Sequence, residues 1–429
     1  MDTIGALPIA PYTCYMAESR FPPIDFHRYH REELPGQLGA GRGALVAHAA
    51  RGCGSLALRL ADDAAYTYRR CEGGVEVLAG DDGADTVIEL DAESWQGLVH
   101  ELEAPAGLLY AGRIRCTRGH AMQLMAWEPG LRALYNGRPL YDPERLDLRD
   151  RHGRPLDVER TFRADDDRLD MAHFLRTAGY LFARGLFAGE EISAFLAESD
   201  ALRGEARKGD KLSWWGRNAD GDEILCRVTR ASAKPRLATL PCDPRILALR
   251  DLAEGPWVHK RGEGAGVTVI YKNPGMVEGL GDIPWHRDCG MGGHAVMCPT
   301  LIASVYLSEA TPETGELVML PGSHRTSYTT IHPNHPEAPR GAHFRARPGD
   351  VSLHYGDTMH AAPPPSAAGG ALYRTSAIVG FARPEAHHHR GEKSYNDVLH
   401  ARADGQVEHL ERVAQRAQRK PPSPANPGA

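Results

Sequence analysis

The chain has 429 residues, a formal net charge of -6 at pH 7, and a composition that is 42% hydrophobic and 25% charged, as is typical of a globular protein of roughly two or three domains. The negative balance gives no support to a nucleic-acid partner, and no apolar run approaches the roughly 20 residues of a membrane span. Residues 1–21 lack the basic region of a signal peptide, and the eight cysteines include no C-x-x-C pair. We therefore expect a cytoplasmic protein with reduced thiols.

Residues 1–145 predict an α+β domain. Apolar side chains alternate with other residues over 56–60, which is the pattern of a half-buried strand. Further short strands separated by Gly and Asp turns are expected at residues 65–70, 74–78 and 86–90. Asp91 then predicts the start of an amphipathic helix, whose apolar stripe consists of Trp95, Leu98, Val99 and Leu102.

Residues 107–138 complete the predicted order of strands and helices in this region. Residues 107–119 predict another pair of strands, and residues 120–135 predict a helical stretch interrupted at Pro129. From about residue 25 to residue 138 this order resembles the sterol-carrier-protein-2-like (SCP2-like) domain, whose Gly-x-Ile turn would here run from Gly112 to Gly119. The resemblance implies a sheet with helices around an apolar tunnel for a lipid or acyl chain. The alternative is that this layer only packs against the rest of the chain or forms a homodimer, and both remain open.

The rest of the chain consists of segments that differ in composition and in predicted secondary structure. Residues 146–170 are dense in charge and poor in apolar residues, which predicts a linker or surface arm. Residues 171–203 predict a helix, a short strand and a second helix. Beyond residue 260 short β-rich runs are broken by Gly and Pro, as in a sandwich, barrel or jelly roll. Residues 401–429 predict the end of a last helix and a disordered Pro-rich tail.

Two features are found in protein kinases, namely a Gly-rich run that leads to Lys272 and the tripeptide His286-Arg287-Asp288. A kinase catalytic loop needs Asn five residues after its Asp, and Gly293 stands there. Lys272 is also too close to His286 in sequence to leave room for the intervening helix and hinge. We therefore exclude a kinase.

The same tripeptide fits an iron site better. Residues i and i+2 of an extended segment point to one face, so His286 and Asp288 can present an imidazole and a carboxylate to one ion. A 2-His-1-carboxylate triad needs a second His from a distant strand, and His360 follows a long β-rich stretch. Arg374 lies on the next predicted strand, where a guanidinium could bind a carboxylate through two parallel hydrogen bonds.

Four segments in this order resemble the phytanoyl-CoA dioxygenase family of Fe(II)/2-oxoglutarate oxygenases over residues 171–383. They are "RTAGYLFARGLF", "PWHRD", "SVYLSEATPETGELVMLPGSHRTS" and "RPGDVSLHYGDTMHAAPP". The resemblance implies a double-stranded β-helix, of the jelly-roll or cupin type, with flanking helices over residues 171–400. It also implies that His286, Asp288 and His360 bind the iron and that Arg374 anchors 2-oxoglutarate.

The sequence departs from the family pattern at two positions. Ala362 stands where the family usually has a Ser that helps to hold the cosubstrate, and a lengthened turn separates His360 from Arg374. Lys272 corresponds to a basic residue that the family often has near the cosubstrate, although an exposed strand lysine is the alternative.

Five other residues are ambiguous at this stage. His354 is expected to pack beside the ligands rather than to bind the metal. Arg287 and His324 are candidate substrate contacts, with a loop-stabilising role as the alternative for His324. Trp214 and Trp215 could line an apolar substrate pocket under a cap or could belong to the core. The run of histidines at 387–389 predicts a solvated segment.

Taken together, these features predict an enzyme. It would use Fe(II), 2-oxoglutarate and O2 to hydroxylate an aliphatic C–H of a small, apolar or lipid-like substrate, with release of succinate and CO2. Relatives that halogenate have Ala or Gly in place of Asp288, so hydroxylation is the expected outcome. The alternatives are a lipid-binding or sensor protein with a vestigial oxygenase fold, and a different metal enzyme on a cupin scaffold, whose His/Glu-rich motif the sequence lacks.

Overall fold

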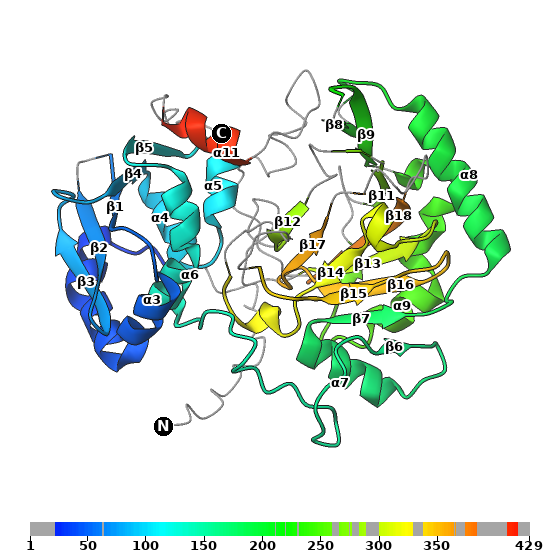
Figure 1. Cartoon of the computed structure of the whole chain (residues 1–429), viewed down its shortest axis with the longest axis horizontal. Coiled ribbons are helices and arrows are strands. Elements are labelled where there is room, and N and C mark those ends of the chain that lie inside the picture. Colours follow the sequence, from blue (N-terminus) through cyan, green and yellow to red (C-terminus); the bar gives the residue numbers. More distant parts are fainter. Residues whose placement is uncertain are drawn as a thin grey trace.

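The computed structural model describes residues 22–61, 64–210, 212–218, 220–229, 231–259, 266–273, 275–276, 283–288, 300–328, 338–363, 365, 374–383 and 410–418. The two largest hydrophobic cores in this part of the chain lie within residues 162–381 and within residues 26–135, the latter joined by Val413 and Ala414 (Figure 1). The domain division near residue 150 stays a prediction. No described helix is long and apolar enough to cross a membrane.

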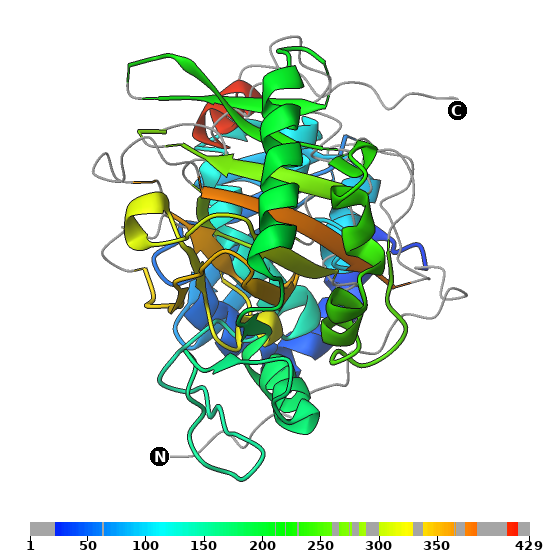
Figure 2. The same cartoon turned by 90° about the vertical axis from the view of Figure 1, so that its right-hand side faces the viewer.

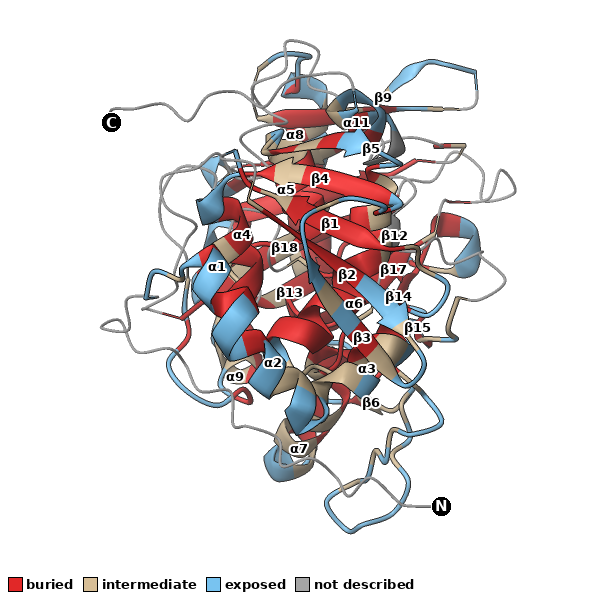
Figure 3. Ribbon diagram, turned by 90° about the vertical axis from the view of Figure 1, so that its left-hand side faces the viewer, coloured by how far each residue is buried: buried red, intermediate tan, exposed pale blue. Residues whose placement is uncertain are grey.

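The N-terminal domain is built on a five-stranded sheet with the strand order β3-β2-β1-β4-β5. The strands are β1 (Leu56–Arg59), β2 (Ala65–Cys71), β3 (Gly74–Ala79), β4 (Thr86–Leu90) and β5 (Ile114–Arg118). The central strand β1 pairs antiparallel with β2 and parallel with β4. Because β1 is enclosed on both edges, it is buried over almost its whole length (Figure 3).

Helices cover this sheet. Their bounds are α1 (Phe26–Arg28), α2 (Leu34–Gln37), α3 (Gly43–Ala49), α4 (Ala92–Val99), α5 (Pro105–Ala111) and α6 (Met122–Asn136). The predicted cap is confirmed, because the Asp91 side chain accepts a hydrogen bond from the backbone N–H of Ser94 at the start of α4. Large aromatic side chains fill the space between helices and sheet, including Tyr68, Trp95, Trp127 and Tyr135.

Two sequence-based expectations for this domain were wrong. The first half of the expected strand pair at 107–119 is helix α5, which begins with Pro105 in its first turn and ends at Gly112 in the left-handed conformation, two strong helix boundaries. Helix α6 also continues through Pro129. Its long buried face, which includes Trp127 and Leu131, offsets the one hydrogen bond that Pro cannot donate.

The segment between the domains contacts the C-terminal domain at two places. The backbone N–H of Tyr141 donates to the carbonyl of Ser327 at 2.8 Å. Farther on, Leu156 and Val158 pack against the C-terminal core. Residues 146–170 therefore form a surface arm with part of its apolar side chains packed on the C-terminal domain.

The C-terminal domain contains a large sheet of nine strands. Its main path has the order β6-β7-β16-β13-β18-β11-β9-β8, and β10 pairs with β18 beside it. The strands are β6 (Thr161–Phe162), β7 (Tyr180–Ala183), β8 (Ser213–Arg217), β9 (Glu223–Val228), β10 (Val258–His259), β11 (Val267–Lys272), β13 (Leu301–Tyr306), β16 (Val351–Tyr355) and β18 (Arg374–Ala382). Helices α7 (Arg168–Ala178), α8 (Gly189–Glu205) and α9 (Pro244–Arg250) cover its outer side (Figure 2).

A second sheet of four strands faces the large one. Its order is β12 (Ile283–His286), β17 (His360–Ala362), β14 (Leu317–Met319) and β15 (Ala342–Phe344). Phe344 joins the two layers, since its ring stacks on Phe182 of β7 at 4.2 Å and meets Tyr306 of β13 edge-on. From β11 onward the chain passes repeatedly between the sheets, so the predicted β-layered domain is confirmed, and the designation as a double-stranded β-helix stays a prediction.

The outer side of the small sheet faces the N-terminal half of the chain (Figure 1). A separate apolar cluster lies there, which we call the outer cluster, and it consists of Tyr141, Trp285, Val318, Leu320, Met359 and Ala361. Tyr141 precedes the arm, the other members come from the C-terminal domain, and Leu146 of the arm packs against them. Tyr141 and Leu146 therefore cover apolar surface of the small sheet that would otherwise be exposed to water.

The last described element, α11 (Leu410–Ala417), returns to the N-terminal domain. Val413 and Ala414 belong to the N-terminal core, and the Gln418 side chain donates to the carbonyl of Gly119 at 2.9 Å. The sequence predicted a helix ending in this region but did not indicate where it packs. The predicted Pro-rich tail and the histidines at 387–389 lie outside the described residues.

Candidate metal centre

His286, Asp288 and His360 meet between the two sheets. Each offers one ligand atom, and these atoms all lie within 4.8 Å of one another. His286 ends β12 and is the cross-strand partner of His360, which begins β17, and their ring centroids are 4.3 Å apart. Oδ1 of Asp288 lies 3.7 Å from Nε2 of His286, and Oδ2 lies 3.8 Å from Nε2 of His360.

The local backbone explains why these side chains converge. Successive side chains of an extended segment alternate between faces, so His286 and Asp288 point inward and Arg287 points outward. The backbone N–H of Asp288 donates to the carbonyl of Gly356 at 2.8 Å. This bond ties the segment that carries His286 and Asp288 to the loop that precedes His360.

The protonation states suit a cation. Burial raises the pKa of Asp288, but His360, His286 and His354 outweigh this effect and hold the pKa well below its usual value. Burial, followed by the nearby His286, lowers the pKa of His360 to about 3. At neutral pH the carboxylate is therefore ionised and the His360 imidazole is neutral, the forms that bind metals.

The orientation of His360 also fits a ligand. Its Nδ1 lies 2.9 Å from the carbonyl oxygen of Thr358. An N–H at Nδ1 would donate to this carbonyl and leave the lone pair on Nε2, which faces Asp288. Two imidazoles and one carboxylate gathered at one point form the donor set of non-haem Fe(II) oxygenases, so the residues present fit that metal.

His354 belongs to the same site. It lies on β16, its Nε2 is 3.7 Å from Oδ2 of Asp288, and its ring centroid is 4.7 Å from that of His360. A separation of 3.7 Å is too long for a hydrogen bond, so the interaction with Asp288 is electrostatic. On the large sheet His354 is the cross-strand partner of Ile302 of β13.

Two buried cations lie on the inner face of the large sheet. Lys272 of β11 and Arg374 of β18 are direct cross-strand partners, with relative exposures of 0% and 5%. Lys272 Nζ donates to the carbonyls of Ala362 and Pro363, just beyond His360. Arg374 donates to the carbonyl of Gly315 at 2.8 Å, and its Nε has no hydrogen-bond partner within the described residues. Two buried cations in neighbouring positions favour the binding of an anion.

The two tryptophans divide between opposite faces of the large sheet. Trp214 pairs with Arg227, which pairs with Ile270, and Ile270 lies on the same face of β11 as Lys272. The Arg227 guanidinium lies 4.5 Å from the Trp214 ring. Trp215 packs against the C-terminal core on the other face. Both tryptophans belong to the edge strand β8, and only Trp214 lies on the same face of the sheet as Lys272 and Arg374.

Two residues that the sequence suggested as substrate contacts lie elsewhere. His324 is buried, its ring stacks on Tyr355, and its Nε2 lies 3.1 Å from the carbonyl of Arg176, so it holds the loop as in the alternative interpretation. Arg287 points outward, where Nη1 lies 3.3 Å from Oδ1 of Asp357 and Nη2 lies 3.3 Å from the carbonyl of Tyr328. Alternation along the strand directs Arg287 away from the face that carries the ligands.

Comparisons with known proteins agree with this geometry. Residues 175–369 match the family model for phytanoyl-CoA dioxygenase (PhyH), which confirms the resemblance seen in the sequence. Ectoine dioxygenase of Bordetella parapertussis is 26% identical over 166 residues, which cover 38% of this chain and 51% of that protein. The chain therefore spans about half the length of this curated relative.

Solved structures that are similar to this chain include the following two, both with TM-scores below 0.5. EvdMO1 has 23% identity and a TM-score of 0.40, over 51% of this chain and 50% of that chain. HygX from Streptomyces hygroscopicus, crystallised with nickel and 2-oxoglutarate, has 19% identity and a TM-score of 0.38, over 50% of this chain and 86% of that chain.

Proposed function

We propose that residues 175–369, a phytanoyl-CoA dioxygenase (PhyH) family domain, act as an Fe(II)/2-oxoglutarate-dependent dioxygenase. The observation that carries the proposal is the convergence of His286, Asp288 and His360 beside two buried cations. When bound, Fe(II) with 2-oxoglutarate and O2 would supply oxidation of a substrate C–H, with formation of succinate and CO2. The three residues would hold the metal on one side and leave the other side for cosubstrate and O2.

The cations would bind the cosubstrate. The guanidinium of Arg374 would pair with the distal carboxylate of 2-oxoglutarate, and Lys272 would add positive charge from the neighbouring strand. Ala362 carries no hydroxyl to assist them, so the anchor depends on these two side chains. The intact ligand set is the argument against the alternative of a lipid-binding or sensor protein with a vestigial oxygenase site.

The substrate is proposed to be a small molecule that is hydroxylated at an aliphatic carbon. Trp214 could contribute an apolar wall to its pocket, because it lies on the same face of the large sheet as Lys272. Delivery of a lipid or acyl chain by an SCP2-like N-terminal domain is a finer hypothesis. One small cavity in that domain has a volume of about 10 Å³, room for about one water molecule, and aromatic side chains fill much of the core.

One experiment tests the reaction class. Anaerobic protein receives Fe(II) and then 2-oxoglutarate, and the visible charge-transfer band of the complex is recorded. O2 is then admitted and succinate is measured. A band followed by succinate supports the proposal, and absence of both from the correctly folded protein contradicts it. Displacement of a fluorescent fatty acid from the full-length protein tests lipid binding separately.

A further inference from the structure

A buried charge network joins the two domains directly behind the candidate metal centre. On the N-terminal side, Glu101 accepts hydrogen bonds from Arg132 at 3.0 Å and from Arg138 at 2.5 Å. On the C-terminal side, Arg287 and Asp357 form the ion pair described above. Nη2 of Arg132 lies 4.0 Å from Oδ1 of Asp357, which connects the two halves.

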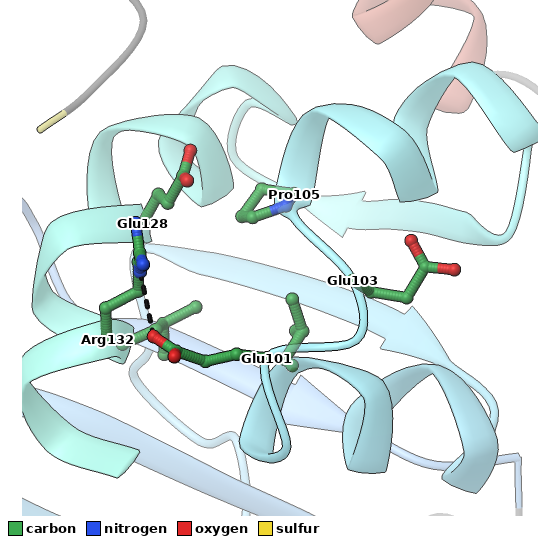
Figure 4. Close-up of a pocket in the computed structure, with 7 residues that line it drawn as sticks. Glu101, Glu103, Pro105, Glu128 and Arg132 are labelled. Atoms are coloured by element: carbon green, nitrogen blue, oxygen red, sulfur yellow. Dashed lines mark hydrogen bonds and ion pairs between the residues drawn. The ribbon is translucent and has the colours of Figure 1, made fainter. Parts of the chain in front are cut away.

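Figure 4 shows the N-terminal side of the network. Arg132 and Glu128 project from α6, and the dashed line joins Arg132 to Glu101. Glu128 is 5% exposed, and its carboxyl group is attracted by Arg287 and repelled by Asp357. Glu101, Glu128 and Arg132 line a small cavity together with Glu103 and Pro105, with a volume of about 10 Å³, which is room for about one water molecule.

The network is nearly inaccessible to solvent. The side chains of Glu101, Arg132, Arg287 and Asp357 are 2–7% exposed. Charges that are buried to this degree are stable only when each is compensated by a partner of the opposite sign. Each domain supplies a nearest partner of its own, since Arg287 pairs with Asp357 and Arg132 pairs with Glu101. The contact of 4.0 Å between Arg132 and Asp357 adds an attraction between the two domains.

Both C-terminal members are continuous in sequence with the ligands. Arg287 lies between His286 and Asp288, and Asp357 precedes His360 by one short turn. The hydrogen bond from the Asp288 backbone to Gly356 joins the same two segments. A displacement of the Arg287 and Asp357 side chains would therefore move all three ligands.

We propose that the N-terminal domain positions the metal ligands through this network, with Arg132 and Glu128 acting on Arg287 and Asp357 as positioning residues. This inference rests on the proposed metal site. It gives the N-terminal domain a role that needs no lipid, because the domain adds charges that act on the two segments that carry the ligands. None of these four residues is assigned to contact the metal or the substrate.

Arg132→Met in the full-length protein is the first test. Glu101 keeps Arg138 as a partner in this variant, so one of the two ion pairs of Glu101 remains. Glu128→Gln, studied at pH 8, is a second variant of nearly unchanged shape. Arg59→Met is the matched control, because Arg59 forms a partly buried ion pair with Asp81 in the same domain.

Two readouts do not depend on turnover. Affinity is measured for Co(II), whose visible absorption reports binding without oxygen chemistry, and hydrogen–deuterium exchange is measured on the metal-free protein. We expect Arg132→Met and Glu128→Gln to weaken Co(II) binding about tenfold, as changes around metal ligands commonly do, and to speed exchange in residues 283–288 and 355–362. Arg59→Met should match the wild type in both measurements.

A double-mutant cycle between Arg132→Met and Asp357→Asn distinguishes an effect transmitted through this contact from a general loss of stability. Coupled effects on Co(II) affinity support the proposal, and additive effects, or unchanged affinity and exchange in both single variants, overturn it. If wild-type protein binds Co(II) and forms the Fe(II)–2-oxoglutarate band while the variants bind equally well, only this inference fails. If wild-type protein binds no metal, the proposed function fails as well.

Discussion

Lys272 and Arg374 lie directly opposite each other on β11 and β18, and both side chains are buried on the face that carries the candidate metal centre. Lys272 donates to the carbonyls of Ala362 and Pro363, and Arg374 donates to the carbonyl of Gly315. Like charges in direct cross-strand positions are unfavourable in a sheet. Their retention at this position favours a site for a doubly charged anion.

The first prediction concerns the cosubstrate. Arg374→Ala should raise the KM for 2-oxoglutarate by at least about tenfold, because a charge-assisted hydrogen bond contributes about 1.5–3 kcal/mol. Affinity for Fe(II) should be nearly unchanged, since Arg374 is outside the ligand set. Arg383→Ala is the control, because the Arg383 guanidinium lies 4.2 Å from the Trp257 ring. A normal KM in the Arg374 variant would assign the anchor to Lys272 or another base.

The second prediction concerns the metal. His360→Ala should abolish the Fe(II)–2-oxoglutarate band and succinate formation, because it leaves only two ligands. The circular dichroism spectrum should stay that of the wild type, since the His360 ring contacts mainly the other polar side chains of the site, His286 and His354. His354→Ala is the comparison variant and should retain the band with altered intensity. Wild-type succinate production by His360→Ala would refute the ligand assignment.

The third prediction concerns pH. Burial raises the pKa of Glu128 from 4.5 to about 7 in the folded protein, so between these values the folded state binds more protons than the unfolded state. This contribution to stability is therefore present below about pH 4.5 and is lost as the pH rises to about 7. Glu128→Gln should remove it, and the unfolding free energy of the variant relative to the wild type should increase by on the order of 3 kcal/mol across this window. Denaturant titrations at pH 5 and pH 8 measure the difference. A difference that does not change with pH would show that Glu128 titrates normally.

The fourth prediction concerns the arm and the N-terminal domain. A chain that begins near residue 160 lacks Tyr141 and Leu146 and exposes Trp285 and Met359 of the outer cluster. Exposure of such side chains costs about 1.5–3 kcal/mol each, so this protein should aggregate or change its oligomeric state in size-exclusion chromatography. Tyr141→Ser in the full-length chain should destabilise it in the same direction but less. A monomeric truncated protein with normal Co(II) affinity would show that the C-terminal domain is independent.

The sequence by itself determined the chemistry of the candidate centre. The spacing of His286 and Asp288 depends only on strand alternation, which is a local property of the backbone. The capped helix after Asp91 and the helix–strand–helix at 168–205 were also predictable, because their boundaries are encoded in neighbouring residues. His360 and Arg374 were candidates because of their order along the chain, and the resemblance to a known family implied their roles.

Tertiary structure decided what the intervening residues do. Arg287 looked like a substrate residue because it stands between two ligands, yet alternation turns it toward Asp357 and the N-terminal domain. Pro129 looked like a helix end, yet packing of α6 carries the helix through it. The return of α11 to the first domain likewise depends on contacts between residues hundreds of positions apart. Burial and charge pairing between distant segments have no local signature, so only the folded chain shows that the two domains share one buried network behind the metal ligands.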